Sequence, residues 1–197
     1  MTELFLYADV FLFRLFNGTL TNPVFDVVMP VITEGKYWLP SYALLLVWLV
    51  WKGGRGGRVC AVLLLLGVII GDQFNSLYLK EWIGRVRPCR ALDAVRLVGV
   101  GCGPGKSFPS SHAVNNFCAA VILTRFFPKT RALAFGIAAV VAFSRVYVGV
   151  HYPADVLAGA GEGALLAFGL LALHRAVTGK FPVFSDENSP PTNKNRQ

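Results

Sequence analysis

The chain has 197 residues, of which 54% are hydrophobic and 15% are charged, and its formal net charge is +8. Because soluble domains usually contain about 25% charged residues, the composition excludes an ordinary soluble fold and indicates a membrane protein. The positive charge does not indicate a nucleic-acid partner. The cations form no stripe and accompany no recognition motif; most of them flank apolar segments, where lipid head groups attract them.

The first apolar segments of the chain are short. Leu4–Phe16 is interrupted by Arg14, and Val24–Thr33 contains Asp26 and Pro30. Neither segment has the roughly 20 apolar residues that a straight span needs. The N-terminus also lacks the basic start and the cleavage site of a signal peptide. We therefore expect short helices here that can lie in the membrane interface.

Five later segments are long and apolar enough to cross a bilayer. They are Tyr37–Trp51, Val59–Leu79, Ser111–Phe127, Ala132–Val148 and Ala154–Leu173. Their apolar runs are continuous rather than alternating, which favours helices over a barrel. The sequence thus predicts an all-α, polytopic transmembrane helix bundle with about five full spans plus short or interfacial N-terminal helices. Residues 1–179 are predicted to form a single domain, and the polar tail 180–197 is expected to be disordered.

The last span is rich in small residues. Gly159, Gly161 and Gly163 are expected to let neighbouring helices pack closely against it. Two acidic residues lie within spans, Asp72 and Glu162. Intramembrane acids usually face the bundle interior, either as a proton or ion relay or as hydrogen-bonded ties between helices.

A first polar motif follows the second span. Lys80 and Arg87 precede Pro88 and lie seven residues apart, which is nearly two helical turns. Both cations point the same way if the helix continues up to Pro88, which stops it. For this fragment alone, two cations snorkelling at a helix end are the better explanation.

A second polar motif, Pro109–His112, opens the third span. Proline and serine suit a helix start, where free N–H groups and the positive end of the helix dipole form a natural cradle for phosphate. His112 would lie inside that first turn. A pair of capping serines, Ser110 and Ser111, with an interfacial histidine explains the same fragment without a ligand.

The third motif joins the last two spans. Arg145 ends the fourth span, and Pro153 suits the start of the last helix. If that turn is formed, Asp155 can reach one ring nitrogen of His151, fix its tautomer and leave the other nitrogen as a nucleophile. A lone His-x-x-x-Asp is common by chance, but the presence of all three motifs at one membrane face is not. Together they can hold a phosphoryl group and transfer it through a histidine, which indicates a lipid phosphate as substrate.

The pattern Lys-x6-Arg-Pro, Pro-Ser-x-His and Ser-Arg-x5-His-x3-Asp, between Lys80 and Asp155, resembles the three signature motifs of the type 2 phosphatidic acid phosphatase superfamily. Ser111 departs from it, because the family often has glycine there. The chain looks like the small bacterial undecaprenyl-diphosphate phosphatases. The resemblance implies hydrolysis of a lipid phosphate or diphosphate, with an isoprenoid diphosphate favoured. Phosphatidylglycerophosphate, phosphatidic acid and lipid A are alternative substrates, and a lipid phosphotransferase and a lipid or phosphate transporter are alternative functions.

The resemblance also implies a role for each motif residue. The catalytic residues are His151, which forms a phosphohistidine, Asp155, which orients it, and His112, which protonates the departing oxygen and then activates water. The phosphoryl oxygens are held by Lys80, Arg87, Ser110, Ser111 and Arg145. Three fixed cations can replace the magnesium that other phosphoryl-transfer enzymes use, so we expect no metal and no cofactor.

The distribution of Lys and Arg predicts the orientation of the bundle. Ten of them lie on the short turns and the tail, and nine lie on the face that carries the motifs, of which three are assigned to the phosphate site. By the positive-inside rule the motif face looks outward, which for a bacterial protein means a cytoplasmic-membrane enzyme facing the periplasm or outside. Cys89 and Cys102 lie in the long loop on this face, where they either pair as a disulfide or remain free thiols.

Overall fold

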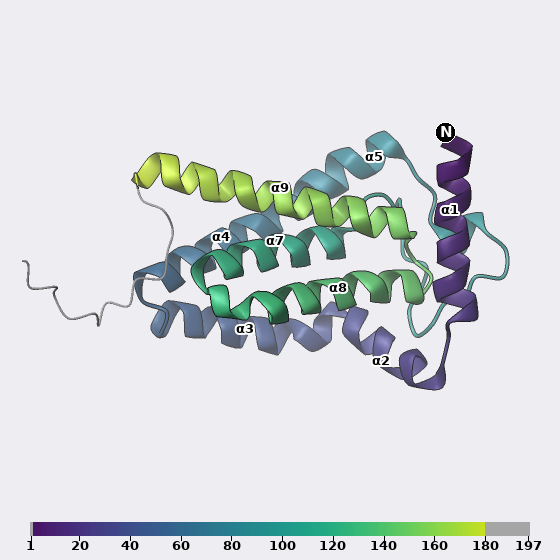
Figure 1. The fold of residues 1–197 in the computed structure, drawn as a ribbon, viewed down its shortest axis with the longest axis horizontal. Helices are drawn as coiled ribbons and strands as arrows, with labels where there is room; N and C mark the ends of the chain where they lie inside the picture. Colours follow the sequence, from purple (N-terminus) through teal and green to yellow (C-terminus); the bar gives the residue numbers. More distant parts are fainter. Residues whose placement is uncertain (1, 180–197) are drawn as a thin grey trace, which may run out of the picture.

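Five long helices lie side by side along the long axis of the molecule (Figure 1). The computed structural model describes residues 2–179, and this part of the chain contains helices and no strand. The five helices are α3 (Gly35–Trp51), α4 (Gly54–Phe74), α7 (Ser111–Phe126), α8 (Arg131–Tyr147) and α9 (Pro153–Thr178). The predicted all-α bundle is therefore confirmed. The predicted polar tail, 180–197, lies outside the described residues, and the assignment of 1–179 to one domain stays a prediction.

Each of the five predicted spans corresponds to a helix, but not every helix is long enough to cross a membrane alone. Within the described residues, three segments are long and apolar enough: Gly54–Ala91, Pro128–Tyr147 and Pro153–Thr178. The bent pair Glu3–Thr19 and Pro23–Thr33, with 116° between its halves, brings the number to four if it counts as one span. Helices α3 and α7 have 17 and 16 residues, short of the ~20 of a typical span. Their ends are set by glycine, proline and polar residues that flank the apolar runs.

Helix α7 lies at the centre of the bundle, in contact with α4, α8 and α9. Its contact with α9 depends on two glycines. A side-chain carbon at Gly163 would collide with the backbone carbonyl oxygen of Val114, and one at Gly159 would lie 2.6 Å from the carbonyl oxygen of Ser110. Gly161 has no atom within 4 Å of that position. The predicted close packing is thus found at Gly159 and Gly163 but not at Gly161, which lies on the opposite side of α9.

The helix that begins at Gly54 does not run to Pro88 as the spacing of Lys80 and Arg87 suggested. It continues through a π-helical turn, η2 (Asn75–Leu79), into α5 (Lys80–Ile83), and ends at Gly84. Gly84 has the positive φ of 66° that favours glycine at a helix end. Arg87 is extended because it precedes Pro88, which disfavours the helical region for it. The condition under which Lys80 and Arg87 would share a helix face is therefore not met, and Arg87 reaches the site from a loop before α6 (Pro88–Ala91).

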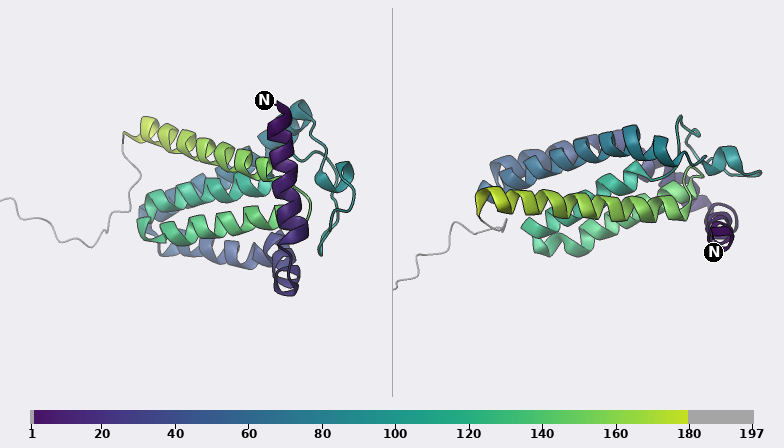
Figure 2. Two further views of the ribbon diagram at one scale, coloured as in Figure 1. Left: turned by 45° about the vertical axis from the view of Figure 1, so that its right-hand side comes forward. Right: turned by 90° about the horizontal axis from the view of Figure 1, so that it is seen from above.

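The N-terminal segments are short helices, as predicted. They are α1 (Thr2–Arg14), the π-helical turn η1 (Leu15–Thr19) and α2 (Pro23–Thr33); the remaining short turn, η3 (Pro128–Thr130), precedes α8. Helix α1 crosses the end of the bundle nearly at right angles to the long helices (Figure 2). The buried side chain of Asn17 fixes this arrangement, since its amide donates to the carbonyl oxygens of Arg96 (2.8 Å) and Tyr147 (2.7 Å). The N-terminal segment is therefore anchored to the end of the bundle that carries the motifs.

Candidate active site

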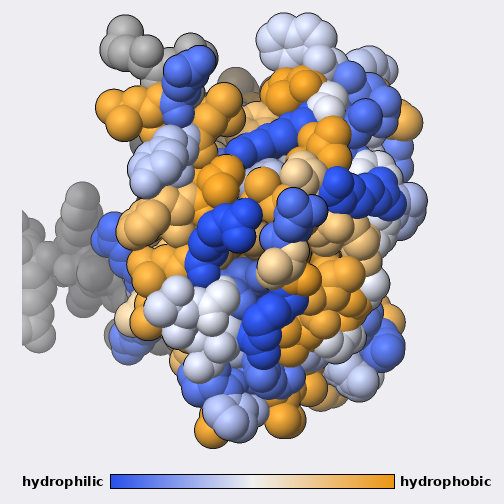
Figure 3. Space-filling view, turned by 90° about the vertical axis from the view of Figure 1, so that its right-hand side faces the viewer, coloured by the Kyte–Doolittle hydropathy of each residue, from blue (hydrophilic) through white to orange (hydrophobic). Residues whose placement is uncertain are grey.

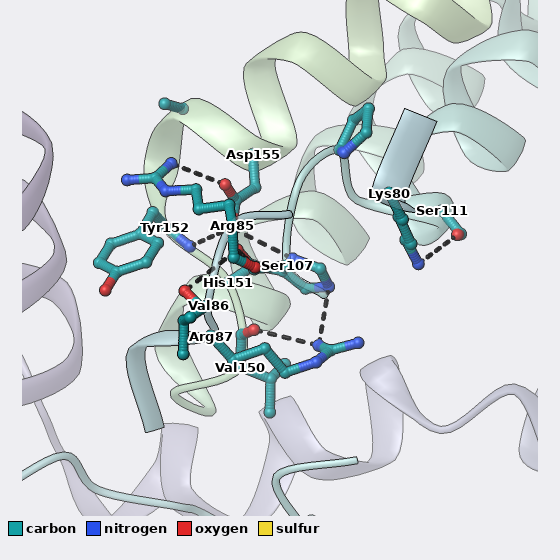
Figure 4. A network of polar contacts seen from close by, with 12 residues as sticks. Lys80, Arg85, Val86, Arg87, Ser107, Ser111, Val150, His151, Tyr152 and Asp155 are labelled. Carbon is teal, nitrogen blue, oxygen red and sulfur yellow. Dashed lines mark hydrogen bonds and ion pairs between the residues drawn. The ribbon is translucent and has the colours of Figure 1, made fainter. Parts of the chain in front are cut away.

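His151 lies in the tight link between α8 and α9, and its side chain is only 2% exposed. The amides of Val150 and His151 both donate to the carbonyl oxygen of Arg145, at 3.2 Å each, which fixes the link. The His151 ring lies between a carboxylate and a guanidinium group (Figure 4). Its Nδ1 is 3.3 Å from Oδ2 of Asp155, and its Nε2 is 3.3 Å from Nη1 of Arg87. Because a carboxylate only accepts and a guanidinium only donates, this geometry assigns the proton to Nδ1 and leaves a lone pair on Nε2.

Burial also keeps the His151 ring neutral. Removal from solvent lowers the pKa of His151 from 6.5 to about 4, although the hydrogen bond with Asp155 acts in the opposite direction. At neutral pH the ring is therefore neutral, with its single proton on Nδ1. A neutral imidazole with a free lone pair on Nε2 is the form that can attack an electrophile.

Asp155 is fully buried and has several partners. Its Oδ2 also accepts from the backbone amide of Tyr152 at 2.8 Å, in a capping arrangement at the start of α9. Its Oδ1 accepts from Nη1 of Arg85 at 2.7 Å. Its backbone carbonyl oxygen accepts from the amide of Ser110 at 3.0 Å, which joins the start of α9 to the start of α7. Asp155 therefore holds the two helix starts together as well as the histidine.

Arg85 was not assigned a role from the sequence. On one continuous helix it would point away from Lys80 and Arg87. Because the helix ends at Gly84, the extended residues that follow bring both Arg85 and Arg87 towards His151 and Asp155. Gly84, four residues after Lys80, was the sequence signal for this break.

The three predicted phosphate-binding cations lie at the same end of the bundle. Arg87 is 8% exposed and donates to the carbonyl oxygen of Val150 at 3.1 Å. Arg145 donates to Oγ1 of Thr33 at 2.6 Å, and Lys80 donates to Oγ of Ser111 at 2.9 Å. The charge of Arg87 acts on both of the other cations. Because these like charges repel and form no salt bridge with the described acids, an anion between them would be stabilised.

The second motif supplies hydroxyl groups and a second histidine. Ser110 holds the N-cap position of α7, but its side chain makes no capping hydrogen bond and its buried hydroxyl has no partner in the described part of the chain. The Nε atoms of Arg87 and Arg145 are likewise buried without a partner there. Unpaired buried polar atoms are costly, so the capping explanation of this motif fails and a ligand is the better one. The first turn of α7 also carries His112, which lies close enough to Arg145 and Lys80 for their charges to act on it.

All eight predicted site residues thus come together at one end of the molecule. The surface of that end shows hydrophilic side chains gathered among apolar ones (Figure 3). The long loop beside it contains a disulfide between Cys89 and Cys102, whose Cα atoms are 6.0 Å apart. Among residues 2–179, no group of three or more His, Cys, Asp or Glu side chains is arranged to hold a metal ion. Glu162 forms no tie between helices, since both of its carboxylate oxygens lack a partner among the described residues.

Known proteins resemble this chain in both sequence and fold. The model of the PAP2 superfamily matches residues 59–178. A lipid A 4'-phosphatase from Bacteroides thetaiotaomicron is 33% identical over 167 residues, covering 81% of this chain and 74% of that protein. An undecaprenyl-diphosphatase from Sulfolobus acidocaldarius is 29% identical over 163 residues, covering 81% of this chain and 75% of that protein.

The solved structure of a transmembrane PAP2-type phosphatidylglycerolphosphate phosphatase from Bacillus subtilis superposes with a TM-score of 0.68 at 30% identity, covering 87% of this chain and 86% of that one. The resemblance carried by the three motifs is therefore confirmed over most of the chain. The chain belongs to the PAP2 superfamily and is a membrane phosphatase that acts on lipid phosphates.

Proposed function

We propose that this phosphatase hydrolyses an isoprenoid diphosphate, such as undecaprenyl diphosphate, through a phosphohistidine on His151. The observation that supports the mechanism is the geometry of the His151 ring, whose Nδ1 faces Asp155 and whose Nε2 faces Arg87. A phosphorus atom bonded to Nε2 would place its oxygens within reach of the Arg87 guanidinium.

The reaction takes two steps. Nε2 of His151 attacks phosphorus, a P–N bond forms, and the bond from phosphorus to the leaving oxygen breaks as His112 donates a proton to that oxygen. His112 then accepts a proton from water, the water oxygen attacks phosphorus, and the P–N bond breaks to release inorganic phosphate. Lys80, Arg87 and Arg145 stabilise the charge on the phosphoryl oxygens in both steps, together with the hydroxyls of Ser110 and Ser111.

Two observations support a diphosphate substrate. Lys80, Arg87 and Arg145 face one another without a carboxylate in contact, which suits a ligand with several negative charges. An undecaprenyl-diphosphatase is also among the relatives that match most of the chain. The second candidate is a lipid A phosphate, which the 33% identity to a lipid A 4'-phosphatase favours.

A substrate panel tests this assignment. Purified protein in detergent is given undecaprenyl diphosphate, lipid A, phosphatidylglycerophosphate or phosphatidic acid, with EDTA present, and inorganic phosphate is measured. We expect the highest kcat/KM with undecaprenyl diphosphate and undiminished turnover in EDTA. A higher kcat/KM with lipid A would replace the proposed substrate. Loss of turnover in EDTA, restored by added metal, would contradict the metal-free mechanism.

The pH dependence of hydrolysis follows from the buried histidine. Because the pKa of His151 is lowered from 6.5 to about 4, the ring stays neutral and nucleophilic down to that pH. We expect kcat/KM, which reports the free enzyme, to have its acid limb well below pH 6.5. An acid limb centred at or above pH 6.5 would rule out a buried neutral His151. The same shift affects the free energy of unfolding. As the pH is lowered from 6.5 to about 4, the unfolded state binds a proton on His151 that the folded state does not, so the folded protein becomes less stable.

We also place the enzyme in the bacterial cytoplasmic membrane with the site facing outward. The excess of Lys and Arg on the opposite turns supports this orientation, and so does the Cys89–Cys102 disulfide, because disulfides persist in oxidising compartments. A membrane-impermeant maleimide should label these two cysteines in intact cells after mild reduction, and protection until the cells are broken would reverse the orientation.

A further inference from the structure

Arg85 joins two buried carboxylates beside the proposed nucleophile. Its Nη1 donates to Oδ1 of Asp155 at 2.7 Å, and its Nη2 forms an ion pair with Oδ2 of Asp9 on α1. Its guanidinium carbon also lies 3.9 Å from the centre of the Tyr152 ring, which packs against one face of the guanidinium group. Both amino groups and one face of this side chain are therefore engaged. Figure 4 shows the contact with Asp155 and the neighbouring Tyr152 ring.

The backbone of Arg85 is fixed as firmly as its side chain. The carbonyl oxygen of Arg85 accepts from the amide of Ser107 at 2.8 Å and from its hydroxyl at 3.3 Å. Ser107 is fully buried in the long loop that leads into α7. Arg85 is thus held in one position relative to the start of α7 and to Asp155.

Asp9 connects the same network to α9. It is 4% exposed, and its Oδ1 accepts from the amide of Ala154 at 2.8 Å, in the first turn of α9 immediately before Asp155. A buried acid of this kind requires a cation and hydrogen-bond donors, and it has both. Helix α1 therefore holds the residue before Asp155 directly and Asp155 itself through Arg85.

We propose that Arg85, held by Asp9, is a positioning residue that fixes the carboxylate of Asp155 and through it the orientation of the His151 ring. This inference rests on the proposed function, in which Asp155 orients the nucleophile. A planar guanidinium can bind two carboxylates at once, whereas an ammonium group is a point charge that cannot match both directions. The phosphate-binding cations do not contact Arg85, so its loss acts on the chemical step rather than on substrate binding.

Kinetics of Arg85→Met, Arg85→Lys and Asp9→Asn in the full-length detergent-solubilised protein test the proposal. A displaced attacking group costs about 10²-fold in rate, so we expect kcat of Arg85→Met to fall by about that factor with KM little changed. Arg85→Lys should recover part of the loss. Asp9→Asn keeps the acceptor for Ala154 but removes the charge, and a loss of about 10-fold in kcat is expected.

Arg96→Met is the matched control. Arg96 also ties the long loop to the N-terminal segment, through an ion pair of 2.7 Å with Asp26, but it does not contact Asp155. We expect Arg96→Met to retain kcat. If it lowers kcat as much as Arg85→Met does, the network only tethers the N-terminal segment and the proposal is wrong.

A double-mutant cycle with Asp155→Asn distinguishes the proposed role of Arg85 from the proposed role of Asp155. If Arg85 acts through Asp155, adding Arg85→Met to Asp155→Asn costs nothing further in kcat; losses that multiply would overturn the inference. Full activity of Asp155→Asn alone would instead refute the proposed roles of His151 and Asp155. Elution as a monodisperse peak in detergent checks the fold, and if Arg85→Met fails to fold, Asp9→Asn carries the same kinetics and the same cycle.

Discussion

Replacing His151 with asparagine is expected to lower phosphate release by at least about 10⁴-fold, because it removes the nitrogen that we propose attacks phosphorus. The asparagine amide can still donate to Asp155, as Nδ1 of His151 does across 3.3 Å in the native protein. The buried carboxylate therefore keeps a partner, and we expect the variant to fold. The measurement is inorganic phosphate released from undecaprenyl diphosphate, beside thermal unfolding of the same preparation.

His174→Asn is the matched control for this substitution. His174 lies near the far end of α9, about 21 residues or 32 Å of helix from Pro153 at 1.5 Å per residue. We expect its phosphate release to equal that of the unmodified protein. Hydrolysis that survives in His151→Asn would remove His151 as the nucleophile, whatever the control shows.

A single methyl group on α9 is expected to destabilise the bundle. In Gly163→Ala the new carbon would collide with the carbonyl oxygen of Val114 and lie 3.0 Å from the amide nitrogen of Cys118. Both contacts are with the backbone of α7, which cannot rotate away as a side chain can. Overpacking of this kind costs about 1–3 kcal/mol, and each kcal/mol shifts Tm by about 2–4 °C in a chain of this size.

Gly161→Ala is the matched control, because it makes the same chemical change at a position where no loss of stability is expected. No atom lies within 4 Å of the carbon that it adds. Alanine favours a helix over glycine by about 1 kcal/mol, so Tm should stay the same or rise. Thermal unfolding followed by tryptophan fluorescence compares the two variants. Equal Tm values would show that α7 and α9 are not held by the glycine contact.

Residue identity and spacing were enough to predict which polar side chains lie together at one end of the bundle. Lys80, Ser110 and His151 belong to motifs whose types and order suit a phosphoryl group, and each lies at the end of an apolar run. Ends of antiparallel spans meet at one membrane face, so convergence followed from topology. The lengths of α3 and α7 were less predictable, because apolar composition does not show where a helix stops relative to the bilayer.

The contacts that organise the site could not be predicted in the same way. Arg85 and Asp9 are 76 positions apart, and nothing local indicates that they form an ion pair. The sequence also left open whether the helix continues to Pro88, since glycine is tolerated within helices and the left-handed turn at Gly84 depends on its tertiary surroundings. Similarly, Gly159 and Gly161 are alike in sequence, and only the position of α7 distinguishes them.

The contact between α7 and α9 has a consequence for how such enzymes can diversify. His112 is carried by the first turn of one helix and Asp155 by the first turn of the other, and the backbones touch at Gly159 and Gly163. The distance between His112, the proposed proton donor, and Asp155, the proposed orienting acid, is thus fixed by contacts between the two backbones, with no side chain between them. Evolution can therefore remodel the outer loop and the lipid-facing surfaces to accept a different head group while the reaction geometry stays constant.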